Sequence, residues 1–298
     1  MNKLLNSTLF AMSQYRQYLP LSLLLLLGAC YEPVEDCLDP EAVNYSVVAD
    51  RNDPDMCLYP ELRLAFRHRY SQGDTILPLG LRDSVYYDQS GQPFRINELR
   101  YYLSNIRLVF EDGSESEVER FIEVELPQAG GGFALRPIED NFALVSPRTT
   151  RNYVPGRLRR SGRVSELRFA LGIEGLVNLA NPESFPDNHP LRLVDSTLHF
   201  NLDSGYVFQY MEIFRDTIAA DTIPVPLRVG TTPYLQEIRL PLPFEKLRGF
   251  HTLITLEVDY SLWFSGIDAR QDSPQALIEK IVANQAQSFR VQAVELSN

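Results

Sequence analysis

The chain has 298 residues, of which 44% are apolar, and it carries a formal net charge of −11 at pH 7. This acidic balance excludes nucleic acid as a natural partner, because binding to phosphates requires a basic surface. The 16 Phe and 15 Tyr residues are enough for a sizeable core, so the length predicts one large domain or two small ones. No apolar run approaches the ~20 residues that a helix needs to cross a bilayer.

The first 29 residues predict a secretory signal peptide that is cleaved before Cys30. Residues 1–17 are polar and contain two cations and no acid, and residues 19–29 are a short apolar run. A positive start, a short apolar core and a small-residue exit are typical of secretory signals. Met12 is an alternative start, because the segment that follows it is also a complete signal.

The Leu-Gly-Ala-Cys sequence that ends at Cys30 resembles a bacterial lipoprotein cleavage site. This resemblance implies that Cys30 is lipidated and that the mature chain is held permanently on a membrane by its acyl chains. An ordinary signal peptide followed by a chance cysteine is the alternative. Acidic residues follow Cys30, as in surface-export signals of some lipoproteins, so we expect an outer-membrane lipoprotein that faces the periplasm or the cell surface.

The two other cysteines, Cys37 and Cys57, are an even pair in a secreted chain, which predicts a disulfide. Residues 37–59 also resemble a short module of secreted Gram-negative proteins, with the form C-x-D-P-x-A-x-N-Y…C. We therefore expect residues 30–60 to be a lipid-anchored linker. Its hard oxygen ligands could hold calcium, although Pro54 interrupts the regular spacing and a polar turn is the alternative. These candidate ligands are Asp50, Asn52, Asp53 and Asp55.

Strand signals dominate the chain from residue 61 to residue 298. Many short alternating runs, separated by turn residues, predict an all-β domain that is an antiparallel β-sandwich or a partly open barrel. The expected strands are 61–67, 94–110 in two halves, 118–126, 164–172, 196–202, 205–214, 223–229, 235–240, 252–262 and 288–296.

One C-terminal helix is expected, because Ser273 can cap it and Pro274 fits its first position. Leu277, Ile278, Ile281 and Val282 then repeat at helical spacing and predict a face that packs on a sheet.

Four histidines are the candidate metal ligands, because imidazole suits copper and zinc. His199 lies on an expected strand, on the face opposite Leu198 and Phe200, so it should sit on a solvated face. His189 lies in a loop, while His68 is flanked by two arginines and His251 precedes a strand. A surface histidine without a ligand role is the alternative at each position.

A second candidate site is a basic patch, which we expect in the loop between residues 148 and 163. It could meet an acidic partner or the phosphates of a lipopolysaccharide, or it could be a solvated hairpin. Its members are Arg148, Arg151, Arg157, Arg159, Arg160 and Arg163.

We expect no enzymatic activity, because the chain contains none of the motifs that mark a nucleophile elbow, a zinc protease or a phosphate loop. A hydrolase whose site carries no recognisable motif is the remaining alternative.

Several segments resemble the MbnP-like family of copper-binding extracytoplasmic proteins, which are often encoded beside di-haem peroxidase-like partners. The most specific is Tyr-Tyr-Leu-Ser-Asn-Ile at 101–106, and weaker matches are R-F-A-L-G-I at 168–173, S-G-Y-V-F at 204–208 and A-N-Q at 283–285. The resemblance runs from about residue 61 to 296. It implies the family's β fold, a copper cofactor and a di-haem peroxidase-like partner.

The chain departs from the family pattern at the positions that concern copper. Family members commonly carry tryptophans just before the S-G-Y segment, where this chain has Phe200 and Leu202. A histidine of the family's H-[LV]-G motif is replaced by Arg228. Two hypotheses follow: a lipid-anchored copper-binding protein, or an interaction lipoprotein that keeps the fold, has lost the metal site and binds a protein or a glycan.

Overall fold

The computed structural model describes residues 32–150, 152–193, 195–215 and 223–298. Contacts between these residues form two compact units, one of residues 32–39 and 45–57 and one of residues 40–44 and 58–298. The predicted signal peptide and Cys30 lie outside the described residues. No helix in the described parts of the chain is long and apolar enough to cross a membrane.

The smaller unit is held by the predicted disulfide, which is confirmed: Cys37 and Cys57 are bonded, with 4.9 Å between their Cα atoms. Two short parallel strands, β1 (Glu35–Asp36) and β2 (Arg51–Asn52), lie within this unit. They are followed by one 3-10 turn (Pro54–Met56), which Asp53 caps by accepting from the Asp55 backbone N–H.

The larger unit contains a five-stranded sheet in the order β10-β3-β16-β17, with β4 also paired to β3. The parallel pair β3–β16 is flanked by antiparallel pairs. The bounds are β3 (Glu61–Gln72), β4 (Thr75–Pro78), β10 (Tyr153–Arg157), β16 (His251–Asp259) and β17 (Phe289–Ser297).

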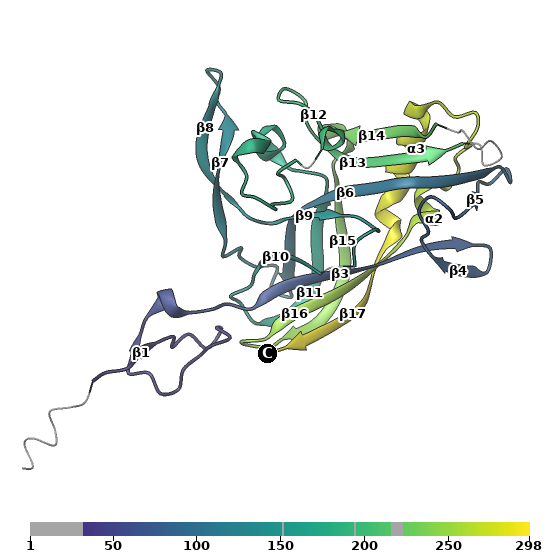
Figure 1. The fold of residues 1–298 in the computed structure, drawn as a ribbon. Helices are drawn as coiled ribbons and strands as arrows, with labels where there is room; N and C mark the ends of the chain where they lie inside the picture. Colours follow the sequence, from purple (N-terminus) through teal and green to yellow (C-terminus); the bar gives the residue numbers. More distant parts are fainter. Residues whose placement is uncertain (1–31, 151, 194, 216–222) are drawn as a thin grey trace, which may run out of the picture. The chain divides into compact units, whose positions relative to one another are not determined.

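The second sheet has eight strands in the order β12-β13-β6-β11-β15, with β14 paired to β13, and β5 and β9 paired to β6 (Figure 1). The bounds are β5 (Tyr86–Tyr87), β6 (Pro93–Phe110), β9 (Phe142–Val145), β11 (Gly162–Leu171), β12 (His199–Asn201), β13 (Gly205–Phe214), β14 (Val225–Gly230) and β15 (Gln236–Lys246). Both sheets are open, so the structure is a sandwich and not a barrel.

The long strand β6 contributes to two apolar cores, one on each face. Tyr101 joins the main core between the two sheets, and its neighbour Tyr102 joins a second core on the opposite face. Side chains alternate between faces along a strand, so the Tyr-Tyr pair supplies one ring to each core. The hairpin of β7 (Phe121–Pro127) and β8 (Phe133–Glu139) contributes Val124, Leu126 and Ile138 to the second core.

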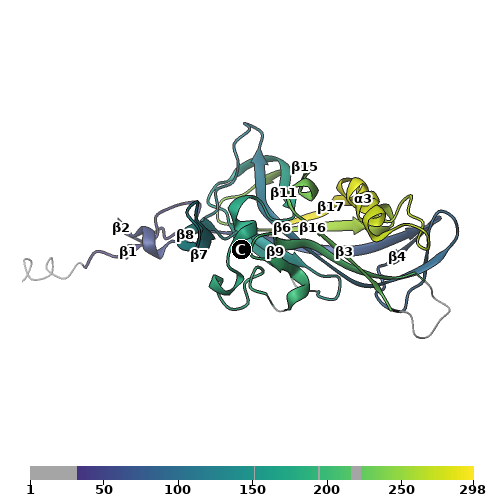
Figure 2. The same cartoon turned by 90° about the horizontal axis from the view of Figure 1, so that it is seen from above.

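The predicted C-terminal helix is confirmed as α3 (Pro274–Gln285), and the Ser273 hydroxyl accepts from the Ala276 backbone N–H at 3.1 Å. Leu277, Ile281 and Val282 are buried as expected. A short helix, α2 (Tyr260–Trp263), follows β16 directly and packs against both β3 and α3. The helix α3 packs against β14 and α2, and Figure 2 shows it at one end of the sandwich.

Some predicted elements differ from the observed ones. The strand expected at 196–202 begins as a 3-10 turn (Ser196–Leu198), so only His199–Asn201 is extended and Leu202 is exposed. The strand expected at 252–262 stops at Asp259, because its side chain caps α2 by accepting from the Ser261 backbone N–H. The other 3-10 turns are Gly175–Leu179, Pro182–Ser184, Thr232–Tyr234 and Ala286–Ser288.

Candidate functional site

The corner formed by β12, β13 and β14 brings together Phe200 and Arg228, two of the three positions at which the chain departs from the family pattern. The Arg228 guanidinium carbon lies 4.7 Å from the centre of the Phe200 ring. One of its terminal nitrogens donates to the backbone carbonyl of His199 at 2.6 Å. A cation over an aromatic face is a favourable arrangement, so the arginine is fixed by both contacts.

The His199 ring lies within the same corner and is only half-buried. It packs edge-on against Tyr206, with 5.1 Å between the ring centres. Its Nε2 atom is buried and has no hydrogen-bond partner among the described residues. Burial and then the charge of Arg228 lower the pKa of His199 below its usual value, so the imidazole is neutral at pH 7.

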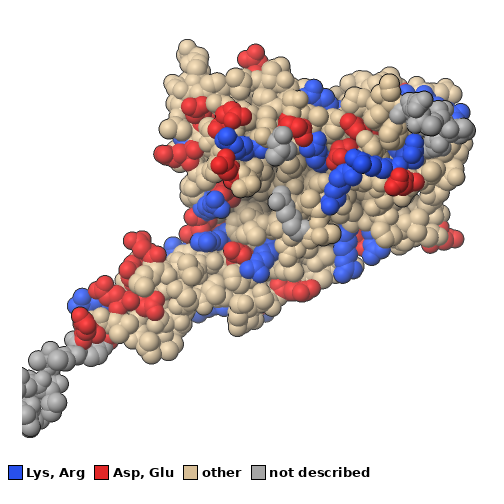
Figure 3. Space-filling model, in the orientation of Figure 1, with Lys and Arg blue, Asp and Glu red and all other residues tan. Residues whose placement is uncertain are grey.

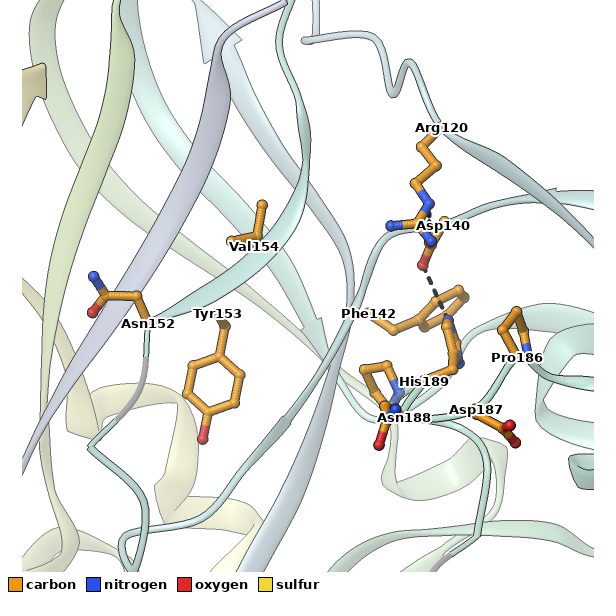
Figure 4. Close-up of a pocket in the computed structure, with 11 residues that line it drawn as sticks. Arg120, Asp140, Phe142, Asn152, Tyr153, Val154, Pro186, Asp187, Asn188 and His189 are labelled. Carbon is orange, nitrogen blue, oxygen red and sulfur yellow. Dashed lines mark hydrogen bonds and ion pairs between the residues drawn. The ribbon is translucent and has the colours of Figure 1, made fainter. Parts of the chain in front are cut away.

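His189 forms the wall of a cleft of about 240 Å³ (Figure 4). Its Nε2 lies 3.0 Å from Asp140 Oδ1, and its Nδ1 accepts from the Leu191 backbone N–H at 3.1 Å. Since Nδ1 is an acceptor, Nε2 carries the proton and donates to Asp140. Asp140 also pairs with the exposed Arg120 at 2.8 Å. The Phe185 ring stacks on the imidazole at 4.8 Å.

The other side of this cleft is formed by the start of β10. Asn152 and Val154 are exposed there, opposite Asn188 and Pro186. The cleft therefore combines amide and charged groups with apolar surfaces, which is the composition of many ligand sites.

His68 and His251 belong to the five-stranded sheet and lie far apart along it. The Nδ1 atom of His251 accepts from the Glu61 backbone N–H at 3.0 Å, whereas the Nδ1 atom of His68 is 2.7 Å from the Tyr260 hydroxyl. Seven residues separate Glu61 from His68 on β3, so the two imidazoles are roughly 23 Å apart at the rise of a strand. Burial lowers the pKa of His68 to about 4.

The four histidines therefore do not form one cluster. Two ring nitrogens of His189 and one each of His68 and His251 are used in internal hydrogen bonds. Within the described ranges, no group of three or more His, Cys, Asp or Glu side chains is placed to hold a metal ion.

The arginines of the predicted basic patch are mostly engaged with acidic or aromatic neighbours. Arg148 pairs with Glu98 at 2.9 Å, Arg160 pairs with Asp112 at 2.7 Å, and Arg163 lies 3.5 Å from Glu245. Arg159 lies over the Tyr59 ring, Arg157 is exposed at the end of β10, and Arg151 lies outside the described residues. Figure 3 likewise shows basic and acidic side chains intermixed on the face in view.

The candidate calcium ligands of the smaller unit are used within its own turns. The Asp50 carboxylate accepts from the Val34 backbone N–H at 3.0 Å, and the Asn52 side-chain oxygen accepts from the Leu38 backbone N–H at 2.8 Å. Together with the Asp53 cap, these contacts favour the polar turn over a calcium loop.

Asp140, Arg120 and Tyr260 were not among the residues that the sequence marked as functional. Asp140 is 49 residues from His189, and Tyr260 is 192 residues from His68. No local spacing signals such pairs. In the sequence, the only feature that points to Asp140 is its position just before a strand.

Comparison with known proteins identifies the family of this chain. A search of the curated proteins found no significant match. Among solved structures, the chain is similar to MbnP from Methylosinus trichosporium, at 15% sequence identity and a TM-score of 0.40, covering 80% of this chain and 98% of that one. The family model described as MbnP matches residues 59–281, most of the larger unit. The chain therefore belongs to the MbnP family.

Proposed function

We propose that this protein is a lipid-anchored extracytoplasmic binding protein that keeps the MbnP fold and recognises a glycan or a protein in place of copper. The observation that carries the proposal is the contact between Arg228 and Phe200. By the family resemblance, these two positions correspond to a metal-site histidine and tryptophan, and they lie against each other in this chain.

The arginine works against a copper ion at this corner. A guanidinium is permanently charged and has no lone pair to offer a metal. A second cation within a few ångströms would be repelled. The nearest candidate ligand, His199, stands alone among the described histidines, since His68, His189 and His251 lie in other elements.

The cleft beside His189 is the better candidate for a ligand. It contains the partly buried carboxylate of Asp140, which is fixed by His189 and Arg120, and its rim carries the exposed amide of Asn152. Fixed polar groups set the orientation of a ligand, while apolar walls supply contact area. Hydroxyl-rich glycans match this combination, so we favour them over an acidic protein. The ion pairs of the basic patch support the same preference.

The location of the protein is part of the proposal. The lipoprotein-like sequence before Cys30 supports an anchor in the outer membrane, facing the periplasm or the cell surface. A disulfide in the smaller unit fits an oxidising compartment. A di-haem peroxidase-like partner, which the family resemblance implies, remains a proposal, as does a role without catalysis.

Copper titration of the full chain in detergent, under reducing and oxidising conditions, tests the loss of the metal site. We expect no binding tighter than ~10 μM, which corresponds to about −7 kcal/mol. The double variant Phe200→Trp with Arg228→His should gain affinity, whereas Arg239→His, at an exposed position of β15, should not. Stoichiometric binding by the unaltered chain that His199→Ala abolishes would refute the proposal.

That outcome would instead support copper binding, the second candidate function. The unpartnered Nε2 atom of His199 is the specific observation that favours it, because an imidazole nitrogen without a hydrogen bond is available to a metal.

A glycan array tests the proposed ligand. We expect the full chain to bind a subset of neutral oligosaccharides, with a loss of about 10-fold or more in Asn152→Ala and Arg120→Ala. Arg239→Ala is the matched control, because Arg239 is an exposed, ion-paired arginine of β15 outside the cleft. Equal binding by all of these proteins would exclude the cleft as the site.

A further inference from the structure

The main core contains a tyrosine that is hydrogen-bonded to a histidine. Tyr260 is fully buried at the start of α2, and its hydroxyl lies 2.7 Å from Nδ1 of His68 on β3. The two rings are nearly parallel, at 21°, with 5.7 Å between their centres. His68 is itself only partly buried, so the pair connects the core with the protein surface.

The direction of this hydrogen bond follows from a third side chain. The Tyr101 hydroxyl is fully buried and lies 3.2 Å from the Tyr260 hydroxyl, its only partner among the described residues. If Tyr101 donates to Tyr260 and Tyr260 donates to His68, every hydroxyl proton has an acceptor. The reverse direction leaves the Tyr101 proton buried without one, which is costly.

His68 is the hydrogen-bond acceptor of the Tyr260 hydroxyl. Burial lowers the pKa of His68 to about 4, so the ring is neutral at pH 7 and its Nδ1 lone pair accepts this hydrogen bond. Burial also raises the pKa of Tyr260 well above its usual value, so the hydroxyl stays protonated. A phenol that loses an electron becomes a strong acid, however, and an apolar core cannot stabilise the resulting cation.

We propose that Tyr260 and His68 form a redox-active tyrosine–histidine pair that takes up the oxidising equivalent of a one-electron oxidant. In the oxidising step, one electron leaves Tyr260 and reduces the oxidant, and the phenolic proton moves to Nδ1 of His68. The products are a neutral tyrosyl radical and an imidazolium. Return of one electron from a reductant reverses both transfers.

Two aromatic neighbours, Trp263 and Tyr101, enclose the Tyr260 radical and extend the route by which an electron can leave Tyr260. Trp263 is fully buried and packs on Tyr260 and Tyr101, with ring centres 5.0 and 5.4 Å apart. The Trp263 indole N–H donates to the Ser288 hydroxyl at 2.6 Å. The enclosed site keeps solvent and other reductants away from Tyr260, which is a condition for a long-lived radical.

The other fully buried tyrosines lack such a base. Tyr206 donates to the Leu191 carbonyl at 2.5 Å, Tyr86 exchanges hydrogen bonds with Gly80, and Tyr102 has no partner among the described residues. A carbonyl cannot hold a proton at neutral pH. The geometry therefore singles out Tyr260 among the fully buried tyrosines, and Tyr206 provides a matched control.

The test is flash oxidation of the full chain in detergent with photogenerated ruthenium(III) tris-bipyridine, followed by absorption and electron paramagnetic resonance. We expect a long-lived neutral tyrosyl signal that Tyr260→Phe reduces by about 10-fold or more and that Tyr206→Phe leaves unchanged. His68→Gln should slow its formation at least about 100-fold, the lower range for a positioned base. Deuterium oxide should also slow it, because the proton moves in the same step.

A long-lived signal that survives Tyr260→Phe would overturn the proposal, since the radical would then belong to another tyrosine. Formation at an unchanged rate in His68→Gln or in deuterium oxide would also overturn it. If Tyr260→Phe fails to fold, the His68→Gln comparison and the isotope effect in the unaltered chain still decide. Copper and glycan binding do not enter the test, so the proposed function can fail independently of it.

Discussion

Mild acidification should lower the stability of the fold, because His68 is partly buried in its neutral form. Burial holds the pKa of His68 at about 4 in the folded protein, whereas an exposed histidine titrates near ~6.5. The unfolded chain therefore binds a proton more readily than the folded one. Stability from the neutral imidazole is fully present above ~6.5 and is lost as the pH falls towards 4.

The size of the effect follows from the difference between these two pKa values. The full difference would be worth about 3 kcal/mol, and between pH 7.5 and pH 5 roughly 2 kcal/mol of it is lost. Because the ring is only partly buried, solvent screening reduces the expected loss to about 1–2 kcal/mol.

Urea unfolding of the full chain at pH 7.5 and pH 5 measures this loss, with His68→Gln as the reference. Carboxylates also titrate in this range, but they do so in both proteins, so the difference between the two isolates His68. We expect the unaltered chain to lose about 1–2 kcal/mol more than His68→Gln. An equal loss in both proteins would refute the reasoning, as would a His68 NMR titration with a pKa near 6.5.

Three further predictions concern stability. Gly205→Ala should destabilise the fold by more than ~3 kcal/mol in urea unfolding, because Gly205 has a φ of +77° and a Cβ would lie 2.2 Å from the Asn178 carbonyl oxygen. Asn141→Ala should cost about 2–4 kcal/mol in the same assay, since this buried side chain accepts from the Ile106 N–H and donates to the Ile106 carbonyl. Reducing the disulfide at Cys37 should remove ~3 kcal/mol from the smaller unit and speed its proteolysis, while leaving the larger unit folded.

Strands could be predicted from the sequence where a run alternates between polar and apolar residues or is bounded by turn residues. The runs at 61–67 and 205–214 alternate or are bounded by turn residues, and both are strands in the structure. The 196–202 run failed because the Asp195 carboxylate accepts from the Thr197 backbone N–H, which begins a 3-10 turn inside an alternating pattern. Such side-chain competition for the backbone is weakly visible in sequence.

The candidate sites were less accessible, because they depend on contacts between distant residues. The pairing of Asp140 with His189 requires the second core to fold a loop back onto the end of β8. The predicted loop of the basic patch was wrong in part, because strand β10 runs through it, and its ion-pair partners Glu98, Asp112 and Glu245 come from other parts of the chain. Periodicity assigns a residue to a face and does not identify its partner across the sandwich.

The corner at Phe200 shows which residue of the family motif is required by packing. Gly230 follows Arg228 in the position of the glycine of H-[LV]-G, and a Cβ there would lie 2.5 Å from the Phe200 ring and 2.9 Å from the Tyr206 carbonyl oxygen. With Phe200 in this place, packing requires a glycine at 230. The chain keeps this glycine, while Arg228 and Phe200 stand where the family pattern has a histidine and a tryptophan. The packing role of Gly230 is therefore independent of copper, which is consistent with the proposal that the fold serves another purpose.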